Sequence, residues 1–236
     1  MSDLVSYHQA AATATITMDD GKVNALSPRM FGELNSALDQ AEAAGVTVIL
    51  TGREGVFSAG FDLSVLRAGG PQATALVRSG FELSARLLEF PAPVVVACPG
   101  HAIAMGVFLL LSGDFRLGAA GPYRITANEV AIGVTMPRPA IEICRQRLAP
   151  AHFNRALILA DVYAPDEAAA AGFLDRVVVP AELGPAAQAV ADQLARLDMA
   201  AHAATKRRIR QPVAEAVRTA LGEDARALAA ATAAGT

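Results

Sequence analysis

The amino-acid sequence predicts an α/β fold with a helical C-terminal region. Between residues 13 and 113, β-branched, strand-like runs alternate with segments whose apolar residues recur at helical spacing, which is typical of an α/β core. The 236 residues are 53% hydrophobic and 18% charged, so the chain has enough apolar surface for a sizeable core. The formal net charge of -3 excludes a nucleic-acid-binding protein that depends on bulk positive charge.

The first predicted strand, residues 13–18, precedes a helix with clear signals at both ends. Ser27 suits the N-cap and Pro28 the first helical position, while Gly45 suits the residue that ends the helix. A β-branched strand is predicted at 46–50, and a glycine-containing loop follows it.

A second helix is predicted over residues 73–90, because its leucines fall on one side and Pro91 stops it. Residues 94–97 read as a buried strand, and 104–113 as a short apolar helix. The rest of the chain is predicted to be mostly helical, and we expect a core domain over 1–195 and a helical region over 196–236. The later helices are predicted at 150–161, 165–172, 181–197 and 199–231, with one strand within 173–179.

Cysteine usage and apolar runs give expectations about location. Cys98 and Cys144 have no paired spacing typical of a disulfide framework or a metal site, so we expect no bound metal. The first twenty residues lack the pattern of a signal peptide. The longest apolar run, between Gly100 and Gly113, is too short to span a membrane. We therefore expect a cytoplasmic protein without membrane or nucleic-acid partners.

Three junctions between loops and regular elements are candidates for chemistry. Residues 57–64 follow a strand and contain a glycine that lets the backbone approach a ligand. Residues 99–106 lead from a buried strand into the apolar helix, whose free N–H groups can donate to a developing oxyanion. Residues 127–133 place one carboxylate, Glu129, in an apolar stretch.

Taken together, in this order and spacing, these segments resemble the crotonase family, the enoyl-CoA hydratase/isomerase superfamily. The resemblance covers roughly residues 10–210 and is more specific as a combination than any segment alone. The matching segments are Asn24-Ala25-Leu26, residues 57–63, residues 100–114 with Asp114 at the end, residues 128–133, and residues 168–179.

The resemblance implies repeated ββα units with a helical C-terminal region, assembled as a homotrimer or a dimer of trimers. It also implies an acyl-CoA thioester substrate, of which coenzyme A is a part, and no separate cofactor. In the family two backbone N–H groups hold the thioester oxygen, and these match Phe61 and Met105. Polarising that carbonyl stabilises an enolate. Hydratases usually carry glycine where this chain has Met105, whereas some isomerases have a larger apolar residue there.

The acidic residues divide the possible reactions. Family hydratases use two glutamates; the second matches Glu129, but the first falls on Phe108, which cannot accept a proton. Family Δ3,Δ2-enoyl-CoA isomerases keep an acid near Glu129 and an uncharged residue near Phe108. The second acid of dienoyl-CoA isomerases would fall on Pro137, which disfavours that subclass. We therefore favour an isomerase, with a hydratase and a non-catalytic acyl-CoA-binding protein as alternatives.

Apolar neighbours such as Val130 and Ile132 are expected to raise the pKa of Glu129. His101 is expected to be a hydrogen-bonded loop residue rather than a base. The residues expected to contact coenzyme A from the resemblance are Lys206 for its phosphates, Lys22 and Arg67 as lesser cations, and Ala59 and Asp62 beside the adenine; Asp62 is favoured as a helix N-cap.

Overall fold

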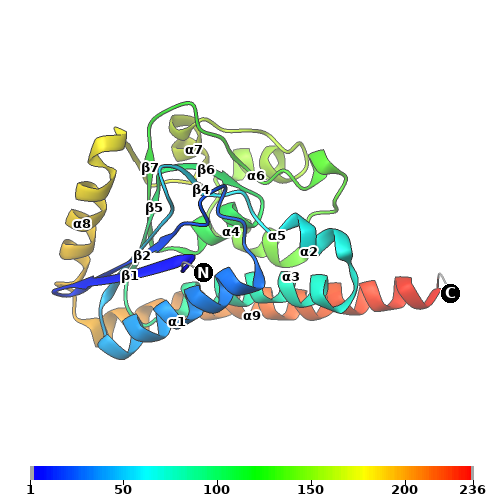
Figure 1. The fold of residues 1–236 in the computed structure, drawn as a ribbon, viewed down its shortest axis with the longest axis horizontal. Coiled ribbons are helices and arrows are strands. Elements are labelled where there is room, and N and C mark those ends of the chain that lie inside the picture. The colour runs from blue at the N-terminus through cyan, green and yellow to red at the C-terminus, as the bar shows by residue number, and fades with distance from the viewer. Residues whose placement is uncertain (1–2, 235–236) are drawn as a thin grey trace.

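The computed structural model describes residues 3–234 of the chain, with side chains described for residues 3–226. Its strands and helices follow each other in repeated ββα units, which confirms the predicted α/β class (Figure 1). The first units are β1 (Val5–Ala10), β2 (Thr13–Met18) and α1 (Pro28–Ala44), then β3 (Thr47–Thr51), β4 (Gly55–Ser58), α2 (Leu63–Ala68) and α3 (Gly70–Glu89).

The third unit and the start of the fourth complete the part of the fold that contains the motifs. They consist of β5 (Val94–Cys98), β6 (Gly100–Ile103) and α4 (Met105–Ser112), then β7 (Phe115–Ala119), β8 (Ile125–Thr126), the 3-10 turn η1 (Val130–Ile132) and α5 (Arg138–Arg145). The remaining elements are α6 (Pro150–Leu157), α7 (Pro165–Ala171), β9 (Arg176–Val178), the 3-10 turn η2 (Pro180–Glu182), α8 (Leu183–Leu194) and α9 (Met199–Ala234).

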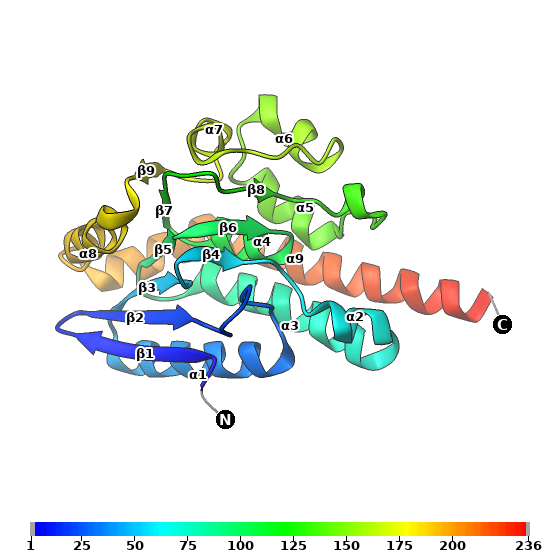
Figure 2. The same ribbon diagram turned by 45° about the horizontal axis from the view of Figure 1, so that its top comes forward.

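The strands form two sheets, and from β3 onward consecutive strands alternate between them (Figure 2). A six-stranded sheet has the order β1-β2-β3-β5-β7-β9, in which β1 and β2 are antiparallel and the other neighbours are parallel. A three-stranded sheet has the order β4-β6-β8 and is wholly parallel. The carboxyl ends of β4, β6 and β8 therefore meet at one edge of the small sheet.

Helices cover both faces of the large sheet. Alternate residues of a strand point to opposite faces, and in β5 Val94 and Val96 join the main core while Val95 faces α8. Helices α1, α3 and α9 pack side by side against the main core (Figure 1). Helix α4 is buried along its whole length. None of the described helices combines the length and apolar character needed to cross a membrane.

Several predicted elements are confirmed. In α1 the Ser27 side chain accepts a hydrogen bond from Met30 N (3.2 Å), Pro28 occupies the first turn, and Gly45 ends the helix with φ +65°. The strand at 13–18 is β2, and the helix predicted over 73–90 is α3, which begins three residues earlier. The sequence analysis missed β1, which is largely exposed, and β4, β6, β7 and β8, which are two to five residues long.

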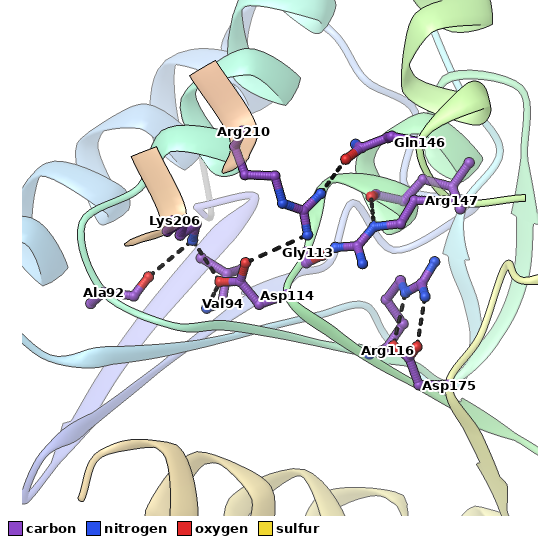
Figure 3. A network of polar contacts seen from close by, with 11 residues as sticks. Ala92, Val94, Gly113, Asp114, Arg116, Gln146, Arg147, Asp175, Lys206 and Arg210 are labelled. Carbon is purple, nitrogen blue, oxygen red and sulfur yellow. Dashed lines mark hydrogen bonds and ion pairs between the residues drawn. The ribbon is translucent and has the colours of Figure 1, made fainter. Parts of the chain in front are cut away.

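Asp114 ties three distant parts of the chain together (Figure 3). Its Oδ2 atom accepts hydrogen bonds from Val94 N at the start of β5 (2.9 Å) and from the Lys206 ammonium on α9 (2.5 Å). Lys206 also donates to the Ala92 carbonyl at 3.2 Å, and its side chain is only 4% exposed. Asp114 itself directly precedes β7, so it fixes α9 to the amino ends of two central strands.

A second ion pair and an arginine extend this network (Figure 3). The buried Arg116 guanidinium on β7 donates to both carboxylate oxygens of Asp175, at 2.9 Å from Nε and 2.7 Å from the second terminal nitrogen. Arg147 donates to the carbonyls of Leu111 and Gly113, at the end of α4. Burial lowers the pKa of Arg147 to about 9, and neighbouring positive charges add to this effect.

We predict that Asp114→Asn lowers the free energy of unfolding by about 3–5 kcal/mol, because it leaves the Lys206 ammonium buried without a carboxylate. Asp39→Asn, which removes an exposed ion pair with Arg86, is the matched control and costs at most about 1 kcal/mol. Urea unfolding followed by circular dichroism measures both. Adding Lys206→Met to Asp114→Asn should restore part of the loss; equal effects of the two single variants would contradict the role given to Asp114.

Candidate active site

The three segments singled out in the sequence lie at one edge of the small parallel sheet. Phe61 lies three residues after β4, Met105 two residues after β6, and Glu129 three residues after β8. The register pairs Gly55 with Gly100 and Ala102 with Ile125, so the three strands end together. In α/β structures this carboxyl edge is where ligands bind.

The loop after β4 is fixed to the segment before α1 by a short parallel bridge. Leu26 N donates to the Gly60 carbonyl at 2.8 Å, and Asp62 N donates to the Leu26 carbonyl at 3.1 Å. Phe61 lies between these two bonds. Its own N–H has no acceptor within the part of the chain that the structure describes. It is therefore available to a ligand oxygen.

Asn24 holds this loop in place through hydrogen bonds. Its buried side chain donates to the carbonyls of Met18 (2.9 Å) and Phe57 (3.1 Å), and its backbone has φ +52°. The Asn24 carbonyl accepts from Ser58 Oγ (2.8 Å), which in turn accepts from Gly60 N (3.1 Å). The sequence analysis matched Asn24 to a family motif without giving it a role, and missed Ser58, for which the sequence carried no signal.

The second N–H group, that of Met105, lies close to this loop. Met105 is the first residue of α4, so its N–H has no acceptor inside that helix, and residues 3–234 supply no other. A Cβ atom at Gly60, where φ is +91°, would lie 3.2 Å from Met105 N and 3.0 Å from the Ala104 Cβ. Glycine at position 60 thus allows the two loops to approach each other. Ala104 adopts φ +51°, a conformation unusual for a residue with a side chain.

Glu129 is a buried carboxylate with an unused hydrogen-bonding atom. The residue is 7% exposed, and its Oε2 atom has no hydrogen-bond partner among the described residues. Burial raises the pKa of Glu129 to about 7, which confirms the expected direction. Val130 and Ile132, two neighbours expected to supply that burial, are themselves 45% and 58% exposed.

The interior residues around the expected acid positions are apolar or neutral. Burial raises the pKa of the Cys144 thiol on α5, and the nearby Glu129 carboxylate raises it further. Phe108 on α4 is buried and stacks on Phe81 of α3, with ring centroids 5.9 Å apart. No other charged group among the described residues contributes to the pKa shift of Glu129, so a second carboxylate is not paired with it. Nor do the described side chains form a cluster that could hold a metal ion.

Three of the residues expected to contact coenzyme A lie together. Lys22 is exposed in the loop before Asn24, and the next residue, Val23, accepts a hydrogen bond from Ala59 N at 3.0 Å. Asp62 caps α2: its carboxylate accepts from Ser64 N (2.8 Å) and from the Ser64 hydroxyl, and the latter bond lowers its pKa.

Lys206 lies elsewhere, and this corrects the expected phosphate contact. Its ammonium is buried and bonded to Asp114 and Ala92, at the amino end of β5. Along the chain, β5 and β6 lie between Ala92, which Lys206 contacts, and Met105. Its neighbours in the same basic run, Arg207 and Arg208, are exposed.

His101 is hydrogen-bonded, as expected, but it lies within β6 and not in a loop. Its Nδ1 atom accepts from Arg124 N at 3.0 Å, and its ring packs edge-to-face on Tyr123. The nitrogen that faces Arg124 is therefore occupied.

The raised pKa of Glu129 predicts a pH-dependent stability. The folded chain holds the proton up to about pH 7 while the unfolded chain releases it near 4.5, so the wild type loses stability as pH rises between these values. Glu129→Gln should therefore be more stable than wild type at about pH 8, by about 3 kcal/mol at most. The difference should vanish below about pH 4.5. Thermal melts across this range measure it.

Glu142→Gln is the matched control, because Glu142 is on the same side of the fold but pairs with Arg145 at the surface, 3.6 Å away. Its stability difference should stay within about 1 kcal/mol, because an ion pair at the surface contributes little. A Glu129→Gln difference that is independent of pH would show that the carboxyl is not buried as described.

Comparisons with known proteins agree with this geometry. The Enoyl-CoA hydratase/isomerase family profile matches residues 8–234. A solved enoyl-CoA hydratase/isomerase family protein from Pseudomonas syringae is 48% identical with a TM-score of 0.93, covering 94% of this chain and 96% of that chain. A solved protein from Mycobacterium tuberculosis, named an enoyl-CoA isomerase in one structure and a probable enoyl-CoA hydratase in another, is 47% identical in the first with a TM-score of 0.92, covering 96% of this chain and 99% of that chain.

A curated relative named "Probable enoyl-CoA hydratase", from Bacillus subtilis, is 34% identical over 125 residues, which are 51% of this chain and 48% of that protein. The match thus spans about half the length of the relative. The names of these proteins include both hydratases and isomerases. With the family profile covering nearly the whole described chain and the folds superimposing closely, this protein belongs to the enoyl-CoA hydratase/isomerase family.

Proposed function

We propose that the protein is an enoyl-CoA isomerase, which moves a double bond of an acyl-CoA thioester, with Glu129 as the acid and base. The observation that carries this proposal is the single buried carboxylate. Among the side chains described, those of residues 3–226, Glu129 is the only buried Asp or Glu. The position that the family resemblance assigns to a second acid is the buried Phe108.

The N–H groups of Phe61 and Met105 would hold the thioester oxygen. Both belong to loops at the carboxyl edge of the small sheet, and neither has an acceptor within the described residues. Donors fixed by the fold stabilise charge on the oxygen without reorganising during the reaction. Loss of one such donor typically costs about 3 kcal/mol of transition-state stabilisation.

The reaction then needs one group that takes a proton and returns it. The Glu129 carboxylate removes a proton from C2 of a 3-enoyl-CoA, and the C2–H electron pair forms a dienolate whose oxygen is held by Phe61 and Met105. The protonated Glu129 gives the same proton to C4, which leaves the double bond between C2 and C3. A carboxyl with a pKa of about 7 suits both steps near neutral pH.

Coenzyme A would enter as part of the substrate. Lys22 is exposed, and its neighbour Val23 accepts a hydrogen bond from Ala59 in the loop that holds Phe61, so Lys22 would pair with a phosphate. The adenine would lie against the backbone near Ala59 and Asp62, as the family resemblance implies. No separate cofactor is required by this chemistry.

The alternative enzymatic function is hydration of a 2-enoyl-CoA. The name of the Bacillus subtilis relative favours it. Hydration requires one group to activate water and another to protonate carbon, so Glu129 would have to perform both. The remaining alternative, an acyl-CoA-binding protein without catalysis, would use the same N–H groups but not the carboxylate.

We predict that the purified protein converts 3-enoyl-CoA to 2-enoyl-CoA faster than it hydrates trans-2-enoyl-CoA. Glu129→Gln should lower kcat for isomerisation by at least about 100-fold, because the amide cannot accept the proton. Glu142→Gln is the matched control and should retain the activity. Absorbance of the conjugated thioester measures both reactions.

Faster hydration than isomerisation by the wild type would support the hydratase instead. Tight binding of acyl-CoA with no turnover of either substrate would support the non-catalytic protein. Full activity of Glu129→Gln would show that another group transfers the proton.

The exposed apolar residues support the homotrimer, or dimer of trimers, that the family resemblance implies. Val130, Val134 and Ile158 are between 45% and 62% exposed and line one groove between the loop after β8 and α6. Exposed apolar side chains gathered on one surface are typical of an interface.

We predict that Ile158→Glu reduces the mass in solution from three or six chains toward one, because it places a charge in this interface. Ile209→Glu is the matched control: Ile209 is 68% exposed, compared with 62% for Ile158, but lies on α9 outside the groove. Light scattering after size-exclusion chromatography measures the mass. An unchanged mass for Ile158→Glu would place the interface elsewhere.

A further inference from the structure

We propose that Gly80, in the interior of α3, is a positioning residue that sets the spacing of the Phe61 and Met105 N–H groups. The inference rests on the proposed function, in which these two groups hold the thioester oxygen. Gly80 is far from both loops in sequence, but it lies against the side chains of Phe61 and Met105.

Gly80 faces Phe61 and Met105 with no room for a side chain. A Cβ atom at position 80 would lie 2.6 and 2.8 Å from the Cε1 and Cζ atoms of the Phe61 ring. The same atom would lie 3.2 Å from the Met105 Sδ. Carbon atoms at optimal contact are about 3.5–4.0 Å apart, so a methyl group here must displace at least one of the two residues.

The Phe61 ring has little freedom to move aside. It packs edge-to-face between Phe31 of α1 and Phe81 of α3, with ring centroids 6.2 and 6.4 Å away. Phe81 is itself stacked on Phe108, 5.9 Å away. A ring that packs on both Phe31 and Phe81 transfers its displacement to its own backbone, which carries the N–H group.

Met105 is equally confined. It is fully buried, and its N–H lies 3.2 Å from where a Cβ at Gly60 would be. The lack of a side chain at Gly60 therefore allows the two loops to approach each other, and the lack of one at Gly80 allows the Phe61 and Met105 side chains to pack against α3. A shift at either contact changes the distance from the N–H groups to a shared oxygen.

An alanine at position 80 is expected to favour the helix while it disturbs the spacing of the two N–H groups. Glycine inside a helix is less favourable than alanine by about 1 kcal/mol, so Gly80→Ala gains helix propensity while it crowds the ring. Gly32, inside α1, has nothing within 4 Å of a Cβ position. Gly32→Ala is therefore the same change in a helix without the contact.

The test compares Gly80→Ala with Gly32→Ala, using 3-enoyl-CoA as substrate. Gly80→Ala should lower kcat about 10- to 100-fold, which is less than the full loss of a donor, and should change KM by less than about threefold. Gly32→Ala should keep wild-type kcat and KM. The ultraviolet enolate band of bound acetoacetyl-CoA gives a second readout, and it should weaken in Gly80→Ala alone.

Phe61→Leu removes the two crowded ring atoms and keeps the backbone N–H. The double variant Gly80→Ala/Phe61→Leu should therefore recover kcat to within about threefold of Phe61→Leu alone. If Gly80→Ala does not fold, this pair of variants still tests the spacing. A folded double variant that stays as impaired as Gly80→Ala would overturn the proposal.

Wild-type kcat and an unchanged enolate band in Gly80→Ala would also overturn it. A wild-type protein that fails to isomerise 3-enoyl-CoA would refute the proposed function instead. In that case the acetoacetyl-CoA band still reports on the N–H groups, so the two failures remain distinguishable.

Discussion

The parallel pairing of β4, β6 and β8 is the constraint on which the candidate site depends. Each strand ends at the same edge, and each is followed within three residues by a group with a chemical use: Phe61 N–H, Met105 N–H and the Glu129 carboxyl. The ββα order makes this possible, because it sends alternate strands to the small sheet while the others build the large sheet beneath it. The site therefore comes from three distant segments without any long loop.

Buried charge serves two different purposes in this fold. Lys206 is compensated by Asp114, and the pair fixes α9 to the start of β5. Glu129 has no such partner among the described residues, and burial instead favours its neutral form. A charge that is paired is structural, whereas an unpaired carboxyl poised near neutral pH can exchange a proton with a ligand. Lys206 and Glu129 are buried to a similar extent, so the presence or absence of a charged partner is what distinguishes them.

The sequence predicted the elements whose signals are local. Ser27, Pro28 and Gly45 define α1 through capping chemistry, and the apolar spacing indicates α3. Strands β4 and β6 have four residues each, and their pairing joins residues far apart in the chain, so no local pattern reveals them. The same limit explains the error at Lys206: a basic run is visible in the sequence, but the aspartate that buries one of its members lies 92 positions away. Glu129 is likewise buried although its neighbours Val130 and Ile132 are exposed, a difference that no local pattern reveals.

Helix α4 connects the site to the polar network at its opposite end. Its first residue presents the Met105 N–H, and its final carbonyls, at Leu111 and Gly113, accept from Arg147. The peptide dipoles of a helix add along its axis, with the positive end at the N–H groups and the negative end at the carbonyls. The arginine neutralises the negative end where water cannot, while the positive end stays unopposed. The dipole of this buried helix is thus directed with its positive end toward the place where an anionic oxygen would form.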